Sequence, residues 1–484
     1  MVVLDRRGLV QVKGLLRAAG YSAEGVAGAL GAAPVPRAYA PFYAARLDER
    51  RPLSALVKLF ALGFAVGRSA AVDVQSLRAA GWVRVDGEQV EPLVRVTPWE
   101  GSLVVHDPED PEQLGPDVVT GPNRASDTLA SLTVRRSVAR ALDLGTGNGL
   151  QALLAKRHAE RVVAADINPR AVELAQLNAA LNEVELDVRE GDGVGPVAGE
   201  QFDLIVCNPP FVISPDTSFT FRDSHTAGDE YCRQIVRQSA GVLREGGFAT
   251  ILCNWICRQP DERWQPLRSW VEDRGCDALL LAQDAADPQT YALAWNEPLR
   301  HDQAAFADAV ERWLDFYDRQ GITAIGLGAI VLRRRQGHNW TRGIDVPLAP
   351  QGSASDHLLR LFAAQDHAPE LSDDHRVLAQ SFSLVDGHRL EQTLTHRGGD
   401  YQAPSAHLVL DQGIALRPPV DPHALQLLFR LEPQRPLGEI IEQAAAEAQT
   451  STQELLPQAL ATIRRLHLDG FITPAAEPLP ASLH

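Results

Sequence analysis

The sequence predicts an α/β fold for the central part of the chain, with a helix-rich module on each side of it. Three observations support this expectation. An apolar strand, 202–207, ends on Asn208-Pro209-Pro210-Phe211, and another, 141–144, runs through a glycine-rich turn into a helix-like segment. The first hundred residues carry helical apolar spacing followed by a hairpin pattern.

The tetrapeptide 208–211 places a side-chain amide oxygen, a backbone carbonyl and an aromatic ring at one strand end. A planar amino group is a poor nucleophile because its lone pair is delocalised. The Asn208 oxygen and the Pro209 carbonyl can accept its two hydrogens, and Phe211 can stack on its plane. We therefore predict catalytic roles for Asn208, Pro209, Pro210 and Phe211. A plain strand-terminating turn is the structural alternative, but a turn has no need of the aromatic residue.

An activated amino nitrogen needs an electrophile to attack. We predict the site for this electrophile at the turn 143–149, which reads Asp-Leu-Gly-Thr-Gly-Asn-Gly and precedes the helix-like segment 151–156. Glycines allow positive φ and close approach of a ligand to the backbone. A helix N-terminus also favours an anionic group. The spacing Gly145-x-Gly147-x-Gly149 differs from the dinucleotide-binding fingerprint. A mere tight turn is the alternative interpretation.

Two further strands end on acidic residues. The strand 161–165 is followed by Asp166 and Ile167, and Asp166 is placed to hydrogen-bond a ribose. The candidate strand 184–188 leads into Gly191-Asp192-Gly193, where the aspartate could meet an adenine amine. As an alternative, Asp166 could cap the helix that follows it.

These motifs, in this order, resemble class I S-adenosylmethionine-dependent methyltransferases that modify amino nitrogens, over about residues 115–340. The continuation Val212-Ile213-Ser214-Pro215 is similar to release-factor glutamine methyltransferases and to adenine- and guanine-amine methyltransferases of RNA and DNA. The resemblance implies a doubly wound, seven-stranded, Rossmann-like sheet, with S-adenosyl-L-methionine across the carboxyl ends of its strands. It implies cofactor contacts from Asp143, Gly145, Thr146, Gly147, Gly149, Asp166, Ile167, Asp192, Gly193 and Asn208.

The segment 121–129 looks like the family's segment that folds over the methionine end of the cofactor, which adds Thr128 to the predicted contacts. Leu129 stands where the family usually has an acid. The alternative is that Ser126 or Asp127 is a simple helix N-cap.

The rest of the core follows from apolar spacing. We expect a helix over 230–243, a fifth strand over 248–252, and a helix over 303–319 between the last two strands, 291–295 and 322–332. The irregular segment 214–228 is expected to form a lid on the acceptor side. Its His225 is interpreted as an ordinary loop histidine.

The flanking modules are predicted over 1–110 and 345–484, around a methyltransferase domain over 115–340. The first has helical spacing over 1–30, 51–61 and 70–80, and then a hairpin with its turn at 86–88. The second has a helix opening at 435, another over 452–468 and a short strand at 470–473. Helices followed by a short hairpin or strand resemble a winged helix.

Composition indicates a soluble globular protein. The 484 residues are 45% hydrophobic and 22% charged, without an apolar run of membrane-spanning length. The start of the sequence lacks a secretory pattern, so a cytoplasmic location is expected. The five cysteines lie within 207–276 without zinc-like spacing, which predicts free buried thiols and no metal site.

Charge bears on the acceptor. The net charge is −16, but residues 1–100 have 13 Lys and Arg against 9 Asp and Glu, whereas residues 101–300 have 18 against 30. Attraction to nucleic acid would come from this head or from local patches at 135–136 or 333–335. A nucleobase amine in RNA or DNA is the first acceptor expected. A protein glutamine amide and a small-molecule amine are the alternatives, and a non-enzymatic winged-helix regulator is the reading of a different class.

Overall fold

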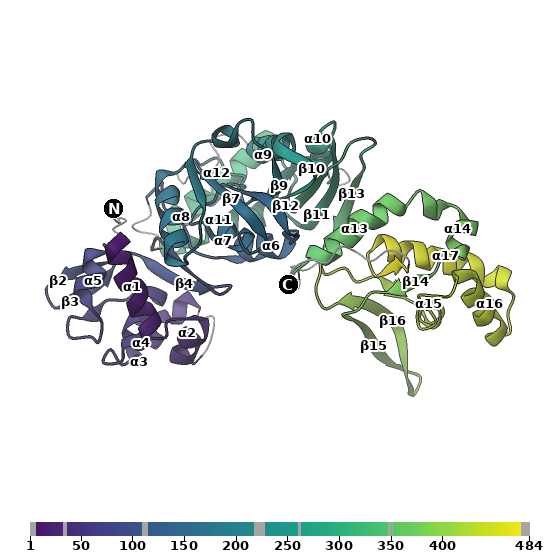
Figure 1. Ribbon diagram of the computed structural model, residues 1–484, viewed down its shortest axis with the longest axis horizontal. Coiled ribbons are helices and arrows are strands. Elements are labelled where there is room, and N and C mark those ends of the chain that lie inside the picture. The colour runs from purple at the N-terminus through teal and green to yellow at the C-terminus, as the bar shows by residue number, and fades with distance from the viewer. Residues whose placement is uncertain are drawn as a thin grey trace. The chain divides into compact units, whose positions relative to one another are not determined.

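The computed structural model describes residues 6–31, 36–108, 115–216, 228–259, 263–346, 350 and 352–475 (Figure 1). The chain divides into two compact units. The first comprises Met1–Leu129 and Val138–Ile344, and the second comprises Ala130–Ser137 and Asp345–His484. Within the described residues, no helix is long and apolar enough to span a membrane.

The first unit is built on an eight-stranded sheet, in the order β13-β11-β12-β10-β9-β6-β7-β8. Strands β10, β9, β6, β7 and β8 pair in parallel, and β12 is antiparallel to both β10 and β11. Seven of these strands give the predicted sheet, and β13 adds an edge strand. The bounds are β6 Val138–Leu144, β7 Ala159–Asp166, β8 Asp187–Glu190, β9 Phe202–Cys207, β10 Leu243–Cys257, β11 Cys276–Ala286, β12 Ala324–Arg334 and β13 Thr341–Asp345.

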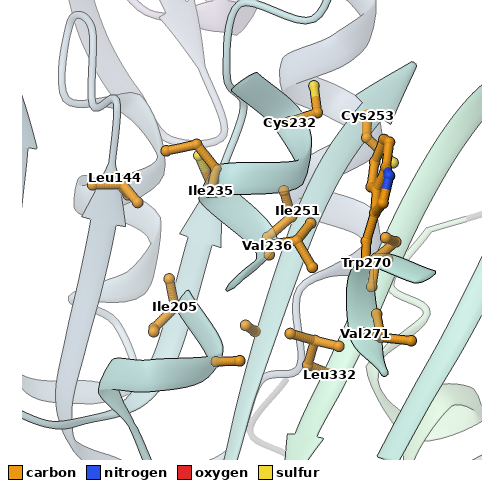
Figure 2. Close-up of a cluster of buried hydrophobic side chains, with 14 of the residues drawn as sticks. Leu144, Ile205, Cys232, Ile235, Val236, Ile251, Cys253, Trp270, Val271 and Leu332 are labelled. Atoms are coloured by element: carbon orange, nitrogen blue, oxygen red, sulfur yellow. The ribbon is translucent and has the colours of Figure 1, made fainter. Parts of the chain in front are cut away.

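Helices cover both faces of this sheet. Helices α9 (Glu230–Val242) and α10 (Gln265–Val271) pack on one face, and Figure 2 shows Ile235 and Val236 of α9 among strand residues such as Ile205 and Ile251. Alternation along β6 points Asp143 to the opposite face, where it meets the start of α7. The other helices are α6 Arg124–Leu132, α7 Leu150–Ala155, α8 Pro169–Leu181, α11 Pro288–Trp295 and α12 Gln303–Gln320.

Two predictions for the core need correction. The segment 291–295, expected to be a strand, lies in helix α11, and the sixth strand is β11, which the apolar pattern had not indicated. The helix forms because Asp287 caps it, accepting a hydrogen bond from the Thr290 backbone, and because Pro288 stands at its first turn. The third strand also begins later than expected, at Asp187.

The N-terminal module packs against α8 through a shared hydrophobic cluster. The clamp between them is polar: the Asn178 side chain pairs with both backbone groups of Val105, and that of Asn182 with both of Leu103. The module's elements are α1 Arg6–Ala18, α2 Ala23–Leu30, α3 Ala40–Arg46, α4 Pro52–Leu56, the π-helix η2 Val57–Ala61, β1 Val66–Gly67, α5 Val74–Ala79, β2 Val83–Asp86, β3 Gln89–Pro92, β4 Arg95–Trp99 and β5 Ser102–His106.

The predicted hairpin of this module is β2 and β3, to which β1 adds a third strand. The expected helix over 70–80 begins only at Val74, where Asp73 caps it. Because this module and the sheet share one compact unit, the boundary near residue 110 stays a prediction, as does the division into three domains.

The second unit has its own hydrophobic core. Its hairpin turns at Gly398-Gly399, both with positive φ, as a two-residue hairpin turn requires. The helices opening at Leu437 and Thr452 and the short closing strand lie where the sequence predicts them. The elements are α13 Ser355–His367, α14 Asp374–Ala379, β14 Phe382–Leu384, β15 His388–Arg397, β16 Asp400–Leu410, β17 Pro419–Val420, α15 Pro422–Leu428, α16 Leu437–Glu447, α17 Thr452–Leu468 and β18 Ile472–Pro474.

Candidate active site at the carboxyl edge of the sheet

The motif 208–211 leaves the sheet beside the glycine turn. Leu144 and Cys207 are register partners in the pair β6–β9, so Gly145 and Asn208 follow two neighbouring strand ends. The Oδ1 atom of Asn208 is buried and has no hydrogen-bond partner among the described residues. Pro209 is buried, whereas Pro210 and Phe211 are partly exposed. An amide oxygen placed this way can accept a hydrogen from a bound molecule.

The three glycines of the turn all have positive φ: 70° at Gly145, 55° at Gly147 and 84° at Gly149. Their surroundings differ. A Cβ at Gly145 would meet nothing within 4 Å, and at Gly147 the nearest atom would be Val119 Cγ1 at 3.9 Å, so both border open space. At Gly149 a Cβ would lie 3.1 Å from Ala175 Cα. Gly149 therefore serves helix packing, and the other two leave room for a ligand.

Asp143 lies beneath the turn and is only 1% exposed. Its Oδ2 accepts hydrogen bonds from Thr146 Oγ1 at 2.5 Å and from the Ala152 backbone N–H at 2.9 Å. Burial raises the pKa of this carboxyl to about 7, against the opposing effect of these two bonds. Asp143 and Thr146, both predicted to contact the cofactor, are thus engaged with each other in holding the turn.

Asp166 links three strand ends. Its Oδ2 accepts from the Gly147 N–H at 2.8 Å, and its Oδ1 from the Asn168 N–H at 2.9 Å. Its backbone carbonyl accepts from the Gly191 N–H at 2.9 Å. Burial raises the pKa of the Asp166 carboxyl. This carboxylate therefore sits next to the space in front of Gly147.

The remaining predicted cofactor residues lie at the same edge. Ile167 is 50% exposed although it is apolar, which suits a residue that covers a flat ligand. Asp192 is exposed after β8. Gly193 has a φ of 51°, a conformation that favours glycine.

The segment before α6 passes over the turn and is tied to it by two asparagines. Asn148 Nδ2 donates to the Thr120 carbonyl at 2.8 Å, and Asn168 Nδ2 donates to the Asp117 carbonyl at 2.9 Å. Sequence reasoning did not give either asparagine a role. The only signal in the sequence is position, because Asn148 directly follows Gly147 and Asn168 directly follows Ile167, both predicted cofactor contacts.

The N-terminus of α6 corrects one alternative. The cap is Asn123, whose Oδ1 accepts from the backbone N–H groups of Ala125 and Ser126, and neither Ser126 nor Asp127 has that role. Asp127 instead accepts a hydrogen bond from the Trp99 indole at 2.8 Å. The Thr128 hydroxyl donates to the Arg124 carbonyl at 2.9 Å. His225 and most of the expected lid lie outside the described residues.

The cysteines agree with the expectation of free thiols. All five are buried, and none of them forms a disulfide. Burial raises the pKa of each thiol, which makes them poor nucleophiles at neutral pH. Among the residues that the structure describes, no cluster of His, Cys, Asp and Glu could hold a metal ion.

Comparisons with known proteins agree on the class. Residues 120–261 match the family model of the methyltransferase small domain. The release factor glutamine methyltransferase of Xylella fastidiosa is 30% identical over 182 residues, which cover 34% of this chain and 63% of that protein. The ribosomal protein L11 methyltransferase of Caldicellulosiruptor saccharolyticus is 44% identical over 68 residues, or 14% of this chain and 22% of that protein.

Among solved structures, YcgJ from Bacillus subtilis is 16% identical, with a TM-score of 0.31, over 44% of this chain and 98% of that one. Over residues 120–261 the chain is therefore similar to methyltransferases. The chain spans less than two thirds of the length of the two curated relatives.

The residues at this edge fit S-adenosylmethionine. Open space in front of Gly145 and Gly147 admits a ligand against the backbone, and the Asp166 carboxylate borders that space. The partnerless oxygen of Asn208 lies one strand away. A ligand at the turn and an amine at the asparagine would therefore lie at neighbouring strand ends.

Proposed function

We propose that the protein transfers the methyl group of S-adenosyl-L-methionine to a planar amino nitrogen. The observation that carries this proposal is the buried Asn208 Oδ1, which has no hydrogen-bond partner in the described structure. A buried acceptor without a donor costs about 1–3 kcal/mol. Keeping one at the end of β9, beside the glycine turn, is understandable if the donor arrives with the substrate.

Each residue then has a defined task. Bound at the turn, S-adenosylmethionine supplies a methyl group on a positively charged sulfur. Asn208 Oδ1 and the Pro209 carbonyl accept the two amino hydrogens, and this directs the nitrogen lone pair out of the amide or ring plane. Phe211 packs on the flat group, and Pro210 keeps the motif rigid. The methylated nitrogen is acidic and releases its proton after the transfer, so no base has to act first.

For the acceptor, charge near the site favours a protein glutamine amide over nucleic acid. Glu190 and Asp192 are exposed at this edge. The partly buried Asp166 lies at the end of β7, and the partly buried Asp229 lies at the start of α9. A polyanion would be repelled from such an edge. The basic patch at 333–335 is also engaged within the protein, because Arg333 and Arg335 form ion pairs with the buried Asp277.

The relatives support the same choice, since release factor glutamine methyltransferases are among them. This reverses the order of acceptors expected from the sequence.

A nucleobase amine is the second candidate, and one observation favours it. Tyr39 and Phe42 in the basic N-terminal module are 62% and 59% exposed, and Arg46 lies over the Phe42 ring at 5.4 Å. Exposed aromatic rings with arginines suit the stacking of unpaired bases.

The flanking modules would bind the acceptor macromolecule. We keep the winged-helix-like assignment for both as part of this proposal, supported by the helices and the three-stranded sheet of the first and by the two helices and terminal strand of the second. A cytoplasmic location also remains a prediction.

The test is transfer of tritium from S-adenosyl-L-[methyl-³H]methionine into a cell extract, followed by digestion. Label that resists nuclease and is released by protease supports the glutamine amide. Label released by nuclease, together with salt-dependent retention of the protein on RNA or DNA, would replace it with the nucleobase amine. Absence of both cofactor binding and labelled product would overturn the methyltransferase proposal itself.

A further inference from the structure

A helical insertion separates the last two strands of the sheet. Strands β11 and β12 are antiparallel neighbours, and such strands can be joined by a turn of two residues. Here α11, the 3₁₀-helix η5 (Glu297–His301) and α12 stand between them. The insertion packs its aromatic side chains against the segment that follows the motif 208–211.

The insertion holds both backbone polar groups of Ile213. The Ile213 N–H donates to the Tyr291 hydroxyl oxygen at 3.2 Å, and the Tyr317 hydroxyl donates to the Ile213 carbonyl at 2.8 Å. Tyr291 is 2% exposed and Tyr317 is fully buried. Two tyrosines from two different helices therefore fix the backbone of one residue on both sides of its Cα, just two residues beyond Phe211.

Asp216 provides a second attachment. Its Oδ2 accepts from the Trp313 indole N–H at 2.8 Å, and its Oδ1 accepts from Arg312 at 2.9 Å. Trp313 is fully buried and packs edge-on against Tyr317, with ring centroids 6.3 Å apart. The segment 212–216 is thus held at both ends by α12.

The insertion also reaches Phe211 and the sheet. Trp295 of α11 meets Phe211 edge-to-face, with centroids 6.4 Å apart and planes at 72°. On its other side, the Tyr291 hydroxyl oxygen accepts from Asn254 Nδ2 of β10 at 2.8 Å. Asn254 is 3% exposed, so this hydrogen bond anchors α11 to a rigid strand.

We propose that Tyr291 and Tyr317 are positioning residues for methyl transfer, which hold the backbone of Ile213 so that Phe211, backed by Trp295, presents its ring to the acceptor plane at a fixed angle. This inference rests on the proposed function and adds to it. In-line transfer is sensitive to geometry, and a displacement of about 1 Å can cost about a hundredfold in rate. The prolines at 209 and 210 restrain the chain before Phe211, and the two tyrosines restrain it after.

Three variants test the inference, each of which removes one hydroxyl and keeps the ring: Tyr291→Phe, Tyr317→Phe and the control Tyr21→Phe. Tyr21 is a matched control because it is 4% exposed and its hydroxyl donates to a backbone carbonyl, that of Val96, at 2.7 Å, within the N-terminal module. The assays are calorimetric binding of S-adenosylmethionine, the melting temperature, and the single-turnover rate of tritium transfer into the extract fraction that the wild-type protein labels.

We expect Tyr291→Phe and Tyr317→Phe to bind the cofactor within about twofold of wild type and to lose about tenfold or more in single-turnover rate. Tyr21→Phe should lower the melting temperature by about as much as the other two variants do, and it should keep the wild-type rate of transfer. Faster hydrogen exchange over 212–216 should accompany the loss in the first two variants only. If Tyr317→Phe does not fold, Asp216→Asn, which weakens the second attachment, should show the same split between binding and rate.

Equal rates in all three folded variants would overturn the inference and leave the proposed function standing. A wild-type protein that neither binds the cofactor nor forms labelled product would overturn both.

Discussion

Replacing Asn208 with alanine should separate catalysis from stability. Because Asn208 Oδ1 has no partner in the described structure, Asn208→Ala breaks no internal hydrogen bond at that atom. Relief of an unsatisfied buried oxygen, about 1–3 kcal/mol, offsets the packing lost with the side chain. The free energy of unfolding should therefore change by no more than about 1 kcal/mol. Turnover should fall by about 10²–10³, the loss seen when one preorganised polar contact to a reacting group is removed.

Asn178 offers the matched control. It is fully buried like the Asn208 oxygen, but its side chain makes three hydrogen bonds, two to Val105 and one to the Asn148 carbonyl. Asn178→Ala should lower the free energy of unfolding by about 3 kcal/mol or more, at about 1 kcal/mol for each bond. Urea unfolding measures stability, and single-turnover tritium transfer measures the rate. A large loss of stability in Asn208→Ala with the rate retained would refute the catalytic role of this amide.

Three other changes have defined outcomes. The pKa of Asp143 is about 7 in the folded protein and near 4 in the unfolded chain, so between these values only the unfolded chain loses the proton. The free energy of unfolding of the wild type should therefore fall by about 3 kcal/mol between pH 5 and pH 8, relative to that of Asp143→Asn. Urea titrations at several pH values would record this difference. Asp166→Ala should weaken calorimetric binding of S-adenosylmethionine by about tenfold or more, and tight binding in the variant would contradict the ribose assignment. Gly149→Ala should lower the unfolding free energy by more than about 1 kcal/mol, because φ is 84° and its Cβ would press on Ala175 at 3.1 Å; an unchanged urea midpoint would contradict this reading.

The parts of the fold that the sequence predicts well are those with local causes. Strands β6, β7 and β9 are buried along their carboxyl halves, which are mostly apolar, and each is followed by the turn or polar residue on which the site depends. Strand β11 was not predicted, because its second residue is Asp277 and a charged residue usually lies at the surface. That charge is buried beside two arginines, Arg333 on the adjacent strand at 2.6 Å and Arg335 at 3.7 Å. No local pattern records a pairing across 56 residues.

Helix α11 differs from the strand predicted there for another reason, because this segment carries two opposed local signals. Aromatic and apolar residues at 291–295 favour a strand by propensity. Asp287 and Pro288, a cap residue followed by a proline, are typical of a helix start, and in the structure the Asp287 side chain accepts from the Thr290 N–H as such a cap does. The helix start determines the structure of this segment more than its composition does, because a cap constrains the backbone directly.

The candidate site divides along the same line. Its glycine turn, acidic strand ends and asparagine motif are short segments whose chemistry can be read in sequence. The residues that would fix the acceptor side, Tyr291 and Tyr317, lie 78 and 104 positions from Ile213, whose backbone they hold. A motif can therefore reveal which groups would react without revealing what orients them. Transfer of 208–216 alone into another sheet of this class should keep the amide oxygen in place and still give a slow enzyme, because Phe211 would lack the helices that set its angle.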